Sequence, residues 1–520
     1  MTARTKLLAG GALAKMLLTP LERPDRLPRS LRAMRPWGSS VAGLVAGAAA
    51  RYPDRVGVVD DDGATTYRDL WRRSQGLAAA LASNGIGSGS RVGLLARNRV
   101  GLIETMTAVD AVGADLVLLN TGFAGPQLAD VVELERIDVL IHDDEFSAAV
   151  ADCGARILVD EAGLAEMTRS GTVEPPARAG KVVILTSGTT GRPKGAARSN
   201  DEGDLEAVAA VIERIPLRLG DTQVVAAPMF HSWGLSHLLL GLARSATTVV
   251  SRRFEPERTL AVTADQGAQV LVVVPVMMSR ILDLRADVLR SHPTPNLRVI
   301  ASSGSTIGSG LVTRILDHFG PVLYNLYGST EVAVATIATP ADLQIDPATA
   351  GRVVIGSRVE ILDADGEPLP DGEVGRVFVG SAMPFDGYTN GGDKERIRGL
   401  LSSGDMGRFL NGLLFVEGRD DDMIVSGGEN VFPAEVEELL RAHPAVADAA
   451  VVGVPDGEFG HALAAFVVTE PGADLTADQV RDHVKMQLAR HKVPRTVAFI
   501  DELPRNATGK LLRRTLDEMT

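Results

Sequence analysis

The chain has 520 residues, more than one hydrophobic core usually supports, so we expect several subdomains of roughly 100–200 residues. Its 45% hydrophobic and 23% charged residues exclude a disordered or fibrous protein. A net charge of -13 argues against a nucleic-acid-binding protein. The single cysteine, Cys153, excludes an intramolecular disulfide and a cysteine-built metal site. It fits a reducing compartment, and we expect a cytoplasmic protein with Cys153 buried.

Residues 1–35 are predicted to form an N-terminal extension with an apolar stretch from Leu7 to Leu18. This stretch is too short to cross a bilayer, which needs roughly 20 residues, and it fits a signal peptide poorly. Two interpretations stay open: a helix packed on the protein body, and a helix that lies on a membrane surface and gives peripheral membrane contact. No other long apolar run is present, which argues against an integral membrane protein.

Further along the chain, helical patterns alternate with short apolar strands. Leu70, Leu77 and Leu81 mark the face of one helix, and a second unit with the same alternation runs from about residue 221 to 339. This alternation predicts an α/β fold in which two layered subdomains contain parallel strands. The expected strands are 91–95, 139–141, 182–185, 224–227, 247–250, 270–274 and 299–301.

The stretch that follows the strand 182–185 is rich in phosphate-binding groups: Thr186-Ser187-Gly188-Thr189-Thr190-Gly191-Arg192-Pro193-Lys194-Gly195. Glycines let backbone N–H groups approach an anion, hydroxyls add donors, and Lys194 adds a positive charge. It is not a Walker A loop, because Gly195 follows Lys194 and the next helix begins only near Asp201. A phosphate-binding loop is the prediction, and a polar linker is the alternative.

After Gly351 the apolar residues recur at every second position, which predicts a small antiparallel or barrel-like section with a turn at Asp365-Gly366. The charged stretch 418–422 then predicts a break in the fold. A helix is expected from Pro433 and strands at 449–454 and 463–468. The predicted division is therefore 1–35, a large N-terminal domain 36–420, and a C-terminal α/β domain 421–520.

Three more constellations carry chemistry, although each alone has a structural explanation. Tyr327-Gly328-Ser329-Thr330-Glu331 offers an aromatic face for a purine, and a hydroxyl and a carboxylate for magnesium. Asp405, expected on a tight turn, suits a sugar diol, and an Asx turn is the structural alternative for such a tripeptide. Lys510 follows a glycine near the end of the chain, where a solvated lysine is the default.

Taken in order, these stretches resemble the adenylate-forming superfamily of acyl-CoA synthetases, nonribosomal peptide synthetase adenylation domains and luciferases. The resemblance runs from about Val41 to the C-terminus. The stretches that carry it are TSGTTGRPKG (186–195), APMFHSWG (227–234), YGSTE (327–331), SSGD (402–405), GRDDDMIVSGGENVFPAEVE (418–437) and LPRNATGK (503–510).

The resemblance implies ATP, Mg²⁺ and CoA, an ATP- and acyl-binding domain at 36–420 and a mobile C-terminal domain at 421–520. It also implies roles for individual residues. Lys510 would be the catalytic lysine between the incoming carboxylate and the α-phosphate, and Asp421 would be the hinge. The other implied roles are: 186–194 on the β- and γ-phosphates, Gly304, Ser305 and Tyr327 around the adenine, Thr330 on the α-phosphate, Glu331 on Mg²⁺, Asp405 and Arg419 on the ribose, His231 between the acyl and thiol pockets, and Ser426, Gly427 and Gly428 along the pantetheine channel. Asn200 departs from the histidine of many relatives.

Apolar residues in 229–240, 273–278 and 301–304 are expected to line the acyl pocket, which favours a fatty or other hydrophobic carboxylic acid. No acidic partner for an amino-acid substrate is evident, unless Asp283 reaches in. The predicted function is an AMP-forming fatty acyl-CoA ligase. An acyl-AMP ligase that loads a carrier protein, a membrane-associated fatty-acid uptake or binding protein, and a light-emitting oxygenase are alternatives, and a homodimer is left open.

Overall fold

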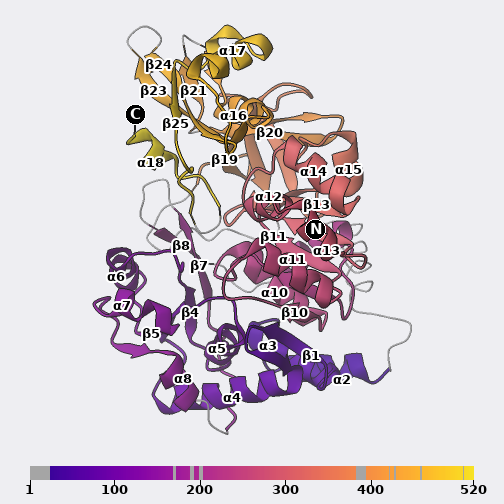
Figure 1. The fold of residues 1–520 in the computed structure, drawn as a ribbon. Coiled ribbons are helices and arrows are strands. Elements are labelled where there is room, and N and C mark those ends of the chain that lie inside the picture. The colour runs from indigo at the N-terminus through magenta and orange to yellow at the C-terminus, as the bar shows by residue number, and fades with distance from the viewer. Residues whose placement is uncertain are drawn as a thin grey trace.

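The computed structural model describes residues 24–167, 171–187, 193–197, 203–381, 394–420, 422–426, 429–456, 460–506 and 509–519. Figure 1 shows a large body that contains the indigo, magenta and orange parts of the chain, with a smaller yellow lobe above it. Within the described residues the strands form four sheets, three of which are accompanied by helices. The predicted α/β fold with a large N-terminal domain and a small C-terminal domain is confirmed.

The first sheet has six strands in the order β6-β5-β3-β4-β7-β8, all parallel except β8. Its central strands are short and buried on both faces, which explains why they read as continuous apolar runs. Its strands are β3 (Arg91–Leu95), β4 (Asp115–Leu118), β5 (Val139–His142), β6 (Ile157–Val159), β7 (Val182–Ser187) and β8 (Pro193–Ala197); the helices of this part of the chain are α4 (Tyr67–Ser83), α5 (Val100–Ala111), α6 (Gly125–Leu134), α7 (Ser147–Val150) and α8 (Glu161–Met167).

The second sheet has nine strands in the order β15-β14-β13-β12-β11-β9-β10-β1-β2. Strands β1 and β2 precede the first unit in the chain but join this sheet, since β1 pairs in parallel with β10. The sequence pattern did not indicate this exchange. The strands are β1 (Val56–Asp60), β2 (Gly63–Thr66), β9 (Thr222–Val225), β10 (Thr247–Val249), β11 (Val270–Val273), β12 (Val299–Ser302), β13 (Leu323–Ser329), β14 (Ala333–Ala338) and β15 (Arg352–Val353).

One hydrophobic core joins these two sheets, because buried side chains such as Val92 on β3 and Leu271 on β11 belong to the same cluster. Helices α3 and α5 contact each other and supply further members of this cluster. The helices that precede, follow or connect the strands of the second sheet are α2 (Arg26–Met34), α3 (Val41–Arg51), α9 (Gly203–Arg214), α10 (Ser232–Ala243), α11 (Pro256–Asp265), α12 (Pro275–Leu282), α13 (Ala286–Ser291), α14 (Ser309–Phe319) and α15 (Pro340–Ile345).

The barrel-like section is a five-stranded antiparallel sheet, as its alternating pattern predicted. The turn at Asp365-Gly366 is closed by a bridge between Leu362 and Pro368, so it lies inside the connection between two strands rather than joining them directly. The strands are β16 (Arg358–Leu362), β17 (Gly375–Gly380), β18 (Arg396–Ile397), β19 (Leu400–Leu410) and β20 (Leu413–Arg419).

The C-terminal lobe has its own sheet and its own buried clusters, around Val451 and Phe466 on one central strand pair. Helix α16 begins at Pro433, as expected, and its Val436 and Leu440 face that core. The elements are β21 (Ile424–Ser426), β22 (Glu429–Val431), β23 (Val446–Asp456), β24 (Gly460–Thr469), β25 (Thr496–Phe499), α16 (Pro433–Arg441), α17 (Ala477–Gln487) and α18 (Arg513–Asp517).

Two expectations about the rest of the chain have different outcomes. Cys153 is a buried free cysteine, as predicted. Residues 1–23, and with them the apolar stretch from Leu7 to Leu18, lie outside the described part of the chain, so both interpretations of this stretch stay predictions. Among the described helices, none is both long enough and apolar enough to span a membrane.

Candidate functional site

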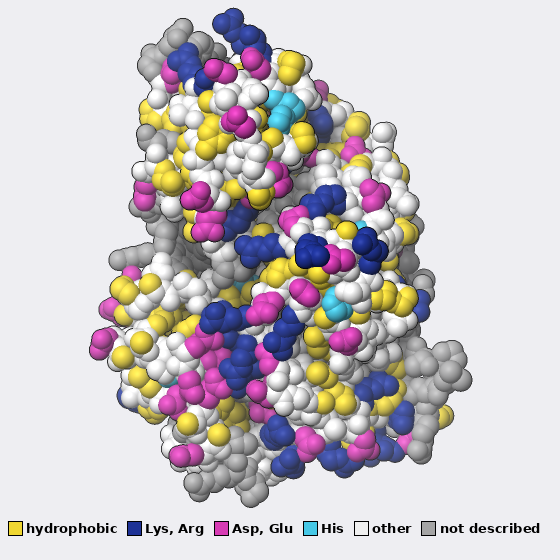
Figure 2. All heavy atoms as spheres, in the orientation of Figure 1, with side chains coloured by type: hydrophobic (Ala, Val, Ile, Leu, Met, Phe, Trp, Pro, Cys, Tyr) yellow, Lys and Arg dark blue, Asp and Glu magenta, His cyan; other side chains and the backbone are white. Residues whose placement is uncertain are grey.

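A cavity of about 2720 Å³ lies where the C-terminal lobe meets the body. Figure 2 shows this meeting line as a narrowing across the molecule, with Lys and Arg side chains along it. Typical small-molecule pockets measure roughly 300–1,000 Å³. The cavity is therefore large enough for more than one substrate at a time.

The predicted phosphate loop begins and ends on the hairpin of β7 and β8. Thr186 pairs with Lys194, and Ser187 with Pro193, in the antiparallel register. Residues 188–192, and with them Gly188, Thr189, Thr190 and Gly191, lie outside the described residues, as do the side chains of Thr186, Ser187 and Lys194. Asp421, Gly427, Gly428, Asn200 and the side chain of Ser426 also lie outside them, so the roles of all these residues stay predictions.

Tyr327, Asp405 and Arg419 meet at one point on the cavity wall. The Tyr327 hydroxyl donates a hydrogen bond to Asp405 Oδ2 at 2.5 Å, and Arg419 Nη1 lies 3.2 Å from Asp405 Oδ1. Burial, aided by the Asp405 carboxylate, raises the pKa of the Tyr327 phenol well above its usual value, so the phenol stays a donor. The structure thus brings together three of the five residues expected around adenine and ribose.

Strand pairing explains how Asp405 and Arg419 come together. They are direct partners in the register of β19 and β20. Asp405 therefore lies within a long strand and not on the isolated tight turn that the sequence suggested. Gly404, with a left-handed φ of 80°, leaves room for the Arg419 guanidinium, which a side chain at position 404 would crowd.

The turn between β13 and β14 carries Ser329, Thr330 and Glu331, and all three line the cavity. The Ser329 hydroxyl donates to Glu331 Oε2 at 2.8 Å, which orients the carboxylate. Within the described ranges no group of three or more His, Cys, Asp or Glu side chains could hold a metal ion. A single carboxylate beside a hydroxyl still fits Mg²⁺, which commonly takes one or two carboxylates and completes its ligands with water and substrate phosphates.

The loop after β12 forms the adjoining part of the cavity wall, with Gly304 and Ser305 lining the cavity. The Ser303 hydroxyl donates to the carbonyl oxygen of Leu326 at 2.9 Å and so ties this loop to β13, on which Tyr327 lies. Gly304 adopts a left-handed φ of 99°. The two segments expected to border the adenine are therefore held side by side.

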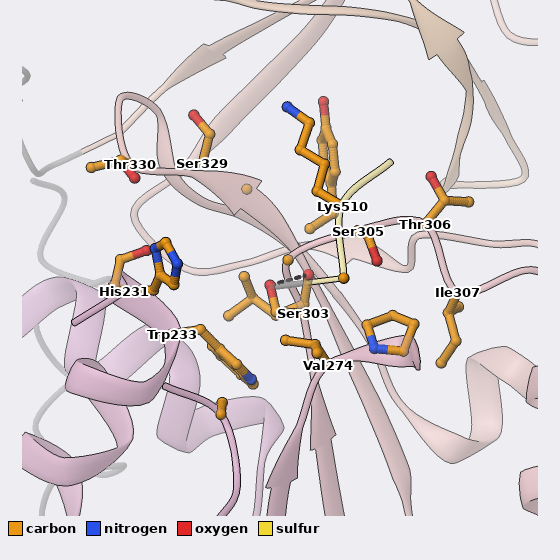
Figure 3. A pocket seen from close by; sticks show the side chains of 18 of the residues that line it. His231, Trp233, Val274, Ser303, Ser305, Thr306, Ile307, Ser329, Thr330 and Lys510 are labelled. Carbon is orange, nitrogen blue, oxygen red and sulfur yellow. Dashed lines mark hydrogen bonds between the residues drawn. The ribbon is translucent and has the colours of Figure 1, made fainter. Parts of the chain in front are cut away.

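Lys510 enters the cavity from the C-terminal lobe (Figure 3), where its side chain extends beside Ser305 and above Ser303. The preceding Gly509 is buried, has a left-handed φ of 77°, and packs so closely on Val276 that a Cβ there would overlap the valine side chain. Lys510, placed about 180 positions after the Tyr327 turn in the sequence, thus shares one cavity with it.

His231 and Trp233 face the cavity from the start of α10 (Figure 3). Burial lowers the pKa of His231 to about 4, so the ring is neutral near pH 7. His231 Nε2 is buried and has no hydrogen-bond partner. The indole N–H of Trp233 donates to the carbonyl oxygen of Val273 at 3.0 Å and so closes the gap between α10 and β11.

One turn further along α10, His237 packs edge-on against Trp233, with the ring centres 4.4 Å apart. Burial lowers the pKa of His237 to about 3, and both of its ring nitrogens lack partners. Sequence reasoning missed His237. Its position one turn after Trp233 on a helix was the available signal.

The acyl pocket is only partly the one expected. Most of the predicted lining does face the cavity, including Trp233, Leu240, Val274 and Val276, whereas a smaller part belongs to the core. Asp283 pairs with Arg314 at 2.7 Å and is not among the lining residues. The core residues are Met229, Val273, Met277, Met278 and Ala301.

Comparisons with known proteins fit this geometry. The family model described as AMP-binding enzyme matches residues 45–389, and the model for the C-terminal domain of AMP-binding enzymes matches residues 435–510. A 2-succinylbenzoate–CoA ligase of Bacillus thuringiensis subsp. konkukian is 30% identical over 473 residues, which are 90% of this chain and 96% of the relative. A feruloyl-CoA synthase of Amycolatopsis sp. is 32% identical over 459 residues, 86% of this chain and 93% of the relative.

Among solved structures, an o-succinylbenzoate CoA synthetase of Bacillus subtilis, in complex with its acyl-adenylate intermediate, superimposes with a TM-score of 0.81. It is 27% identical, and the match covers 91% of this chain and 97% of that one. The similarity therefore extends over the body and the C-terminal lobe together.

Proposed function

This chain belongs to the AMP-binding enzymes of the adenylate-forming superfamily, and from this premise we propose how it acts and on which acids. It is an AMP-forming acid–thiol ligase that uses ATP, Mg²⁺, CoA and a small carboxylic acid. The observation that carries the proposed mechanism is the meeting of Lys510 with Tyr327, Asp405 and Glu331 in one cavity.

In the proposed first step, a carboxylate oxygen of the acid attacks the α-phosphorus of ATP, and pyrophosphate leaves. The attack joins two anions, so it needs positive charge at the point where they meet. Lys510 supplies that charge from the C-terminal lobe and neutralises the oxygens on which charge accumulates. Asp405, held by Arg419, accepts hydrogen bonds from the ribose hydroxyls.

Magnesium, when bound, would neutralise the phosphate oxygens; we propose the carboxylate of Glu331 as its protein ligand and the Thr330 hydroxyl as a contact of the α-phosphate. In the second step, the thiol of CoA attacks the carbonyl carbon of the acyl-AMP and AMP leaves. The neutral ring of His231 lies between the acyl part of the cavity and the Thr330 turn (Figure 3), where it can orient the acyl carbonyl without adding charge.

For the acid, we propose a carboxylic acid with an aromatic body as the first candidate. The relatives named for succinylbenzoate and ferulate support this class. The hydrogen bond of Trp233 to the Val273 carbonyl, which fixes a flat aromatic side chain in the cavity wall, supports it too. This replaces our expectation of a fatty acid as the preferred substrate.

A fatty acid remains the second candidate because the cavity continues beyond Trp233. The lining residues Trp233, His237, Leu240 and Ala243 follow one face of α10 over roughly 15 Å, at 1.5 Å per residue. Residues of α2 and α3 line the far end. A long acyl chain would use this length if Trp233 turned aside.

Acid-dependent thioester formation, measured across benzoates, cinnamates and fatty acids of increasing length, tests the substrate class. We expect the aryl acids to give the highest kcat/KM. Trp233→Ala should raise kcat/KM for long-chain acids while lowering it for aryl acids. A wild-type preference for long fatty acids would instead favour the second candidate.

Two earlier expectations stay predictions: the division into 1–35, 36–420 and 421–520, and the membrane contact of the N-terminal extension. For the latter, α2 carries the exposed residues Arg29, Arg32 and Leu31, and Leu31, 55% exposed, also lines the far end of the cavity. Figure 2 shows Lys and Arg side chains along the lower right edge, where Figure 1 places α2. A basic helix with an exposed leucine is compatible with an anionic lipid surface.

A further inference from the structure

Helix α16 of the C-terminal lobe reaches the body through Glu438. Its Oε1 atom accepts a hydrogen bond from the backbone N–H of Ser309 at 3.0 Å and another from the Ser309 hydroxyl. Both residues are half-buried. The contact joins positions 129 residues apart, and each lies in a part of the molecule with its own core.

Ser309 is the first residue of α14, and this helix lacks a cap of its own. The N-cap position is Gly308, with a left-handed φ of 71° and no side chain, and the first turn contains no acidic residue. The start of a helix exposes unpaired N–H groups and carries a partial positive charge. Glu438 therefore supplies from the other lobe both the acceptor and the negative charge that α14 lacks.

The capped end of α14 continues directly from the loop that lines the cavity. Residues 303–308 of this loop precede Ser309. Lys510, which belongs to the C-terminal lobe, lies near the same loop (Figure 3). Gly509 packs on Val276 of α12, which contacts α14. Glu438 and Gly509 are thus two points at which the C-terminal lobe contacts the body beside the cavity.

The neighbouring glutamates on α16 are bound within their own lobe. Glu437 Oε1 accepts from the backbone N–H of Val451 at 2.9 Å and pairs with Arg513. Glu435 pairs with Lys492. Glu438 differs from both, because its hydrogen bonds cross to the body.

We propose that Glu438 is a positioning residue for adenylation: by capping α14 it holds the C-terminal lobe in the orientation that places Lys510 in the cavity. The inference rests on the proposed function, since it assigns Lys510 to the first half-reaction. It predicts that loss of Glu438 slows the step that needs Lys510 and spares the step that does not.

The test compares Glu438→Ala with Glu435→Ala, a matched control on the same helix whose ion pair stays within the lobe. Acid-dependent pyrophosphate release should fall about tenfold in Glu438→Ala, which is the usual effect of losing hydrogen bonds to a charged group. Thioester formation from supplied acyl-AMP and CoA should stay at the wild-type rate. Glu438→Gln should recover part of the loss, because its amide oxygen still accepts from Ser309.

Hydrogen–deuterium exchange at the first turn of α14, measured without substrate, gives a readout that does not depend on activity. We expect the Ser309 amide to exchange faster in Glu438→Ala than in Glu435→Ala or the wild type. Equal slowing of both half-reactions, or unchanged pyrophosphate release, would overturn the proposal. If the wild type releases no pyrophosphate with any acid, the proposed function fails, and unchanged exchange would separately refute the contact.

Discussion

The body and the C-terminal lobe contribute to the cavity in different ways. Asp405 and Arg419 are direct partners across two long strands, and Tyr327 lies on a strand of the nine-stranded sheet. Lys510 lies on an irregular segment between β25 and α18, beside the isolated bridge from Arg505 to Leu511. The sheets of the body therefore fix the positions of the residues proposed to bind the nucleotide. The position of Lys510 depends instead on how the C-terminal lobe docks on the body.

Replacing Lys510 should separate the two contributions most strongly. In Lys510→Ala we expect pyrophosphate release to fall by about 10²–10³, the usual cost of losing one preorganised charge at a transition state. Thioester formation from supplied acyl-AMP should persist, since no carboxylate has to be joined to a phosphate in that step. Lys485→Ala, on the exposed side of α17, is the control. Equal loss of both half-reactions would contradict the role given to Lys510.

A change at Gly509 tests the docking without removing the amine. In Gly509→Ala the new Cβ overlaps Val276, and the left-handed backbone becomes strained. Pyrophosphate release should fall roughly 10- to 100-fold, because a displacement of about 1 Å can cost 10²-fold. Val276→Ala combined with Gly509→Ala should recover part of the activity. No recovery in the double variant would mean that strain, and not the contact, displaces the lysine.

Asp405→Asn should weaken ATP binding by the body without changing how the C-terminal lobe docks. The amide keeps an acceptor for the Tyr327 hydroxyl but loses the negative charge that pairs with Arg419. We expect the KM for ATP to rise about tenfold with a smaller change in kcat, which corresponds to one lost charge-assisted hydrogen bond. Steady-state kinetics at saturating acid measure this. An unchanged KM would remove Asp405 from the nucleotide site.

The last prediction concerns stability and pH, and not catalysis. Burial holds the pKa of His237 at about 3, whereas an unfolded histidine titrates near 6.5. Between these values the unfolded chain binds the proton and the folded protein does not, so stability falls as the pH is lowered. His237→Phe should flatten the dependence of the unfolding free energy on pH by about 1.4 kcal/mol per pH unit. The exposed His461 is the control position, and an unaltered slope in His237→Phe would contradict its burial in the neutral form.

The sequence predicted the parts of this structure that local patterns encode. Short apolar runs identified the strands from 91–95 to 299–301, and the antiparallel section followed from alternation after Gly351. The placement of β1 beside β10 was missed, because strand exchange between sheets leaves no local pattern. The contact of Glu438 with Ser309 was missed for the same reason: it exists only once two lobes have folded.

In the candidate site, too, local sequence patterns predicted some features and left others out. The motifs containing Tyr327, Asp405, Arg419 and Lys510 were recognised along the chain, and the structure brings these residues to one cavity. The extent of the acyl pocket was overestimated, because apolar residues of the core and of a pocket look alike in a sequence. Met229 and Met278 are fully buried core residues, whereas Trp233 faces the cavity.

The measurement that tests the central claim most directly is exchange of labelled pyrophosphate into ATP by the wild-type enzyme in the absence of CoA. If the cavity first joins the acid to AMP, exchange should require the carboxylic acid and Mg²⁺ but no thiol, and it should be lost in Lys510→Ala. Exchange that required CoA, or that proceeded equally well without any acid, would contradict the account.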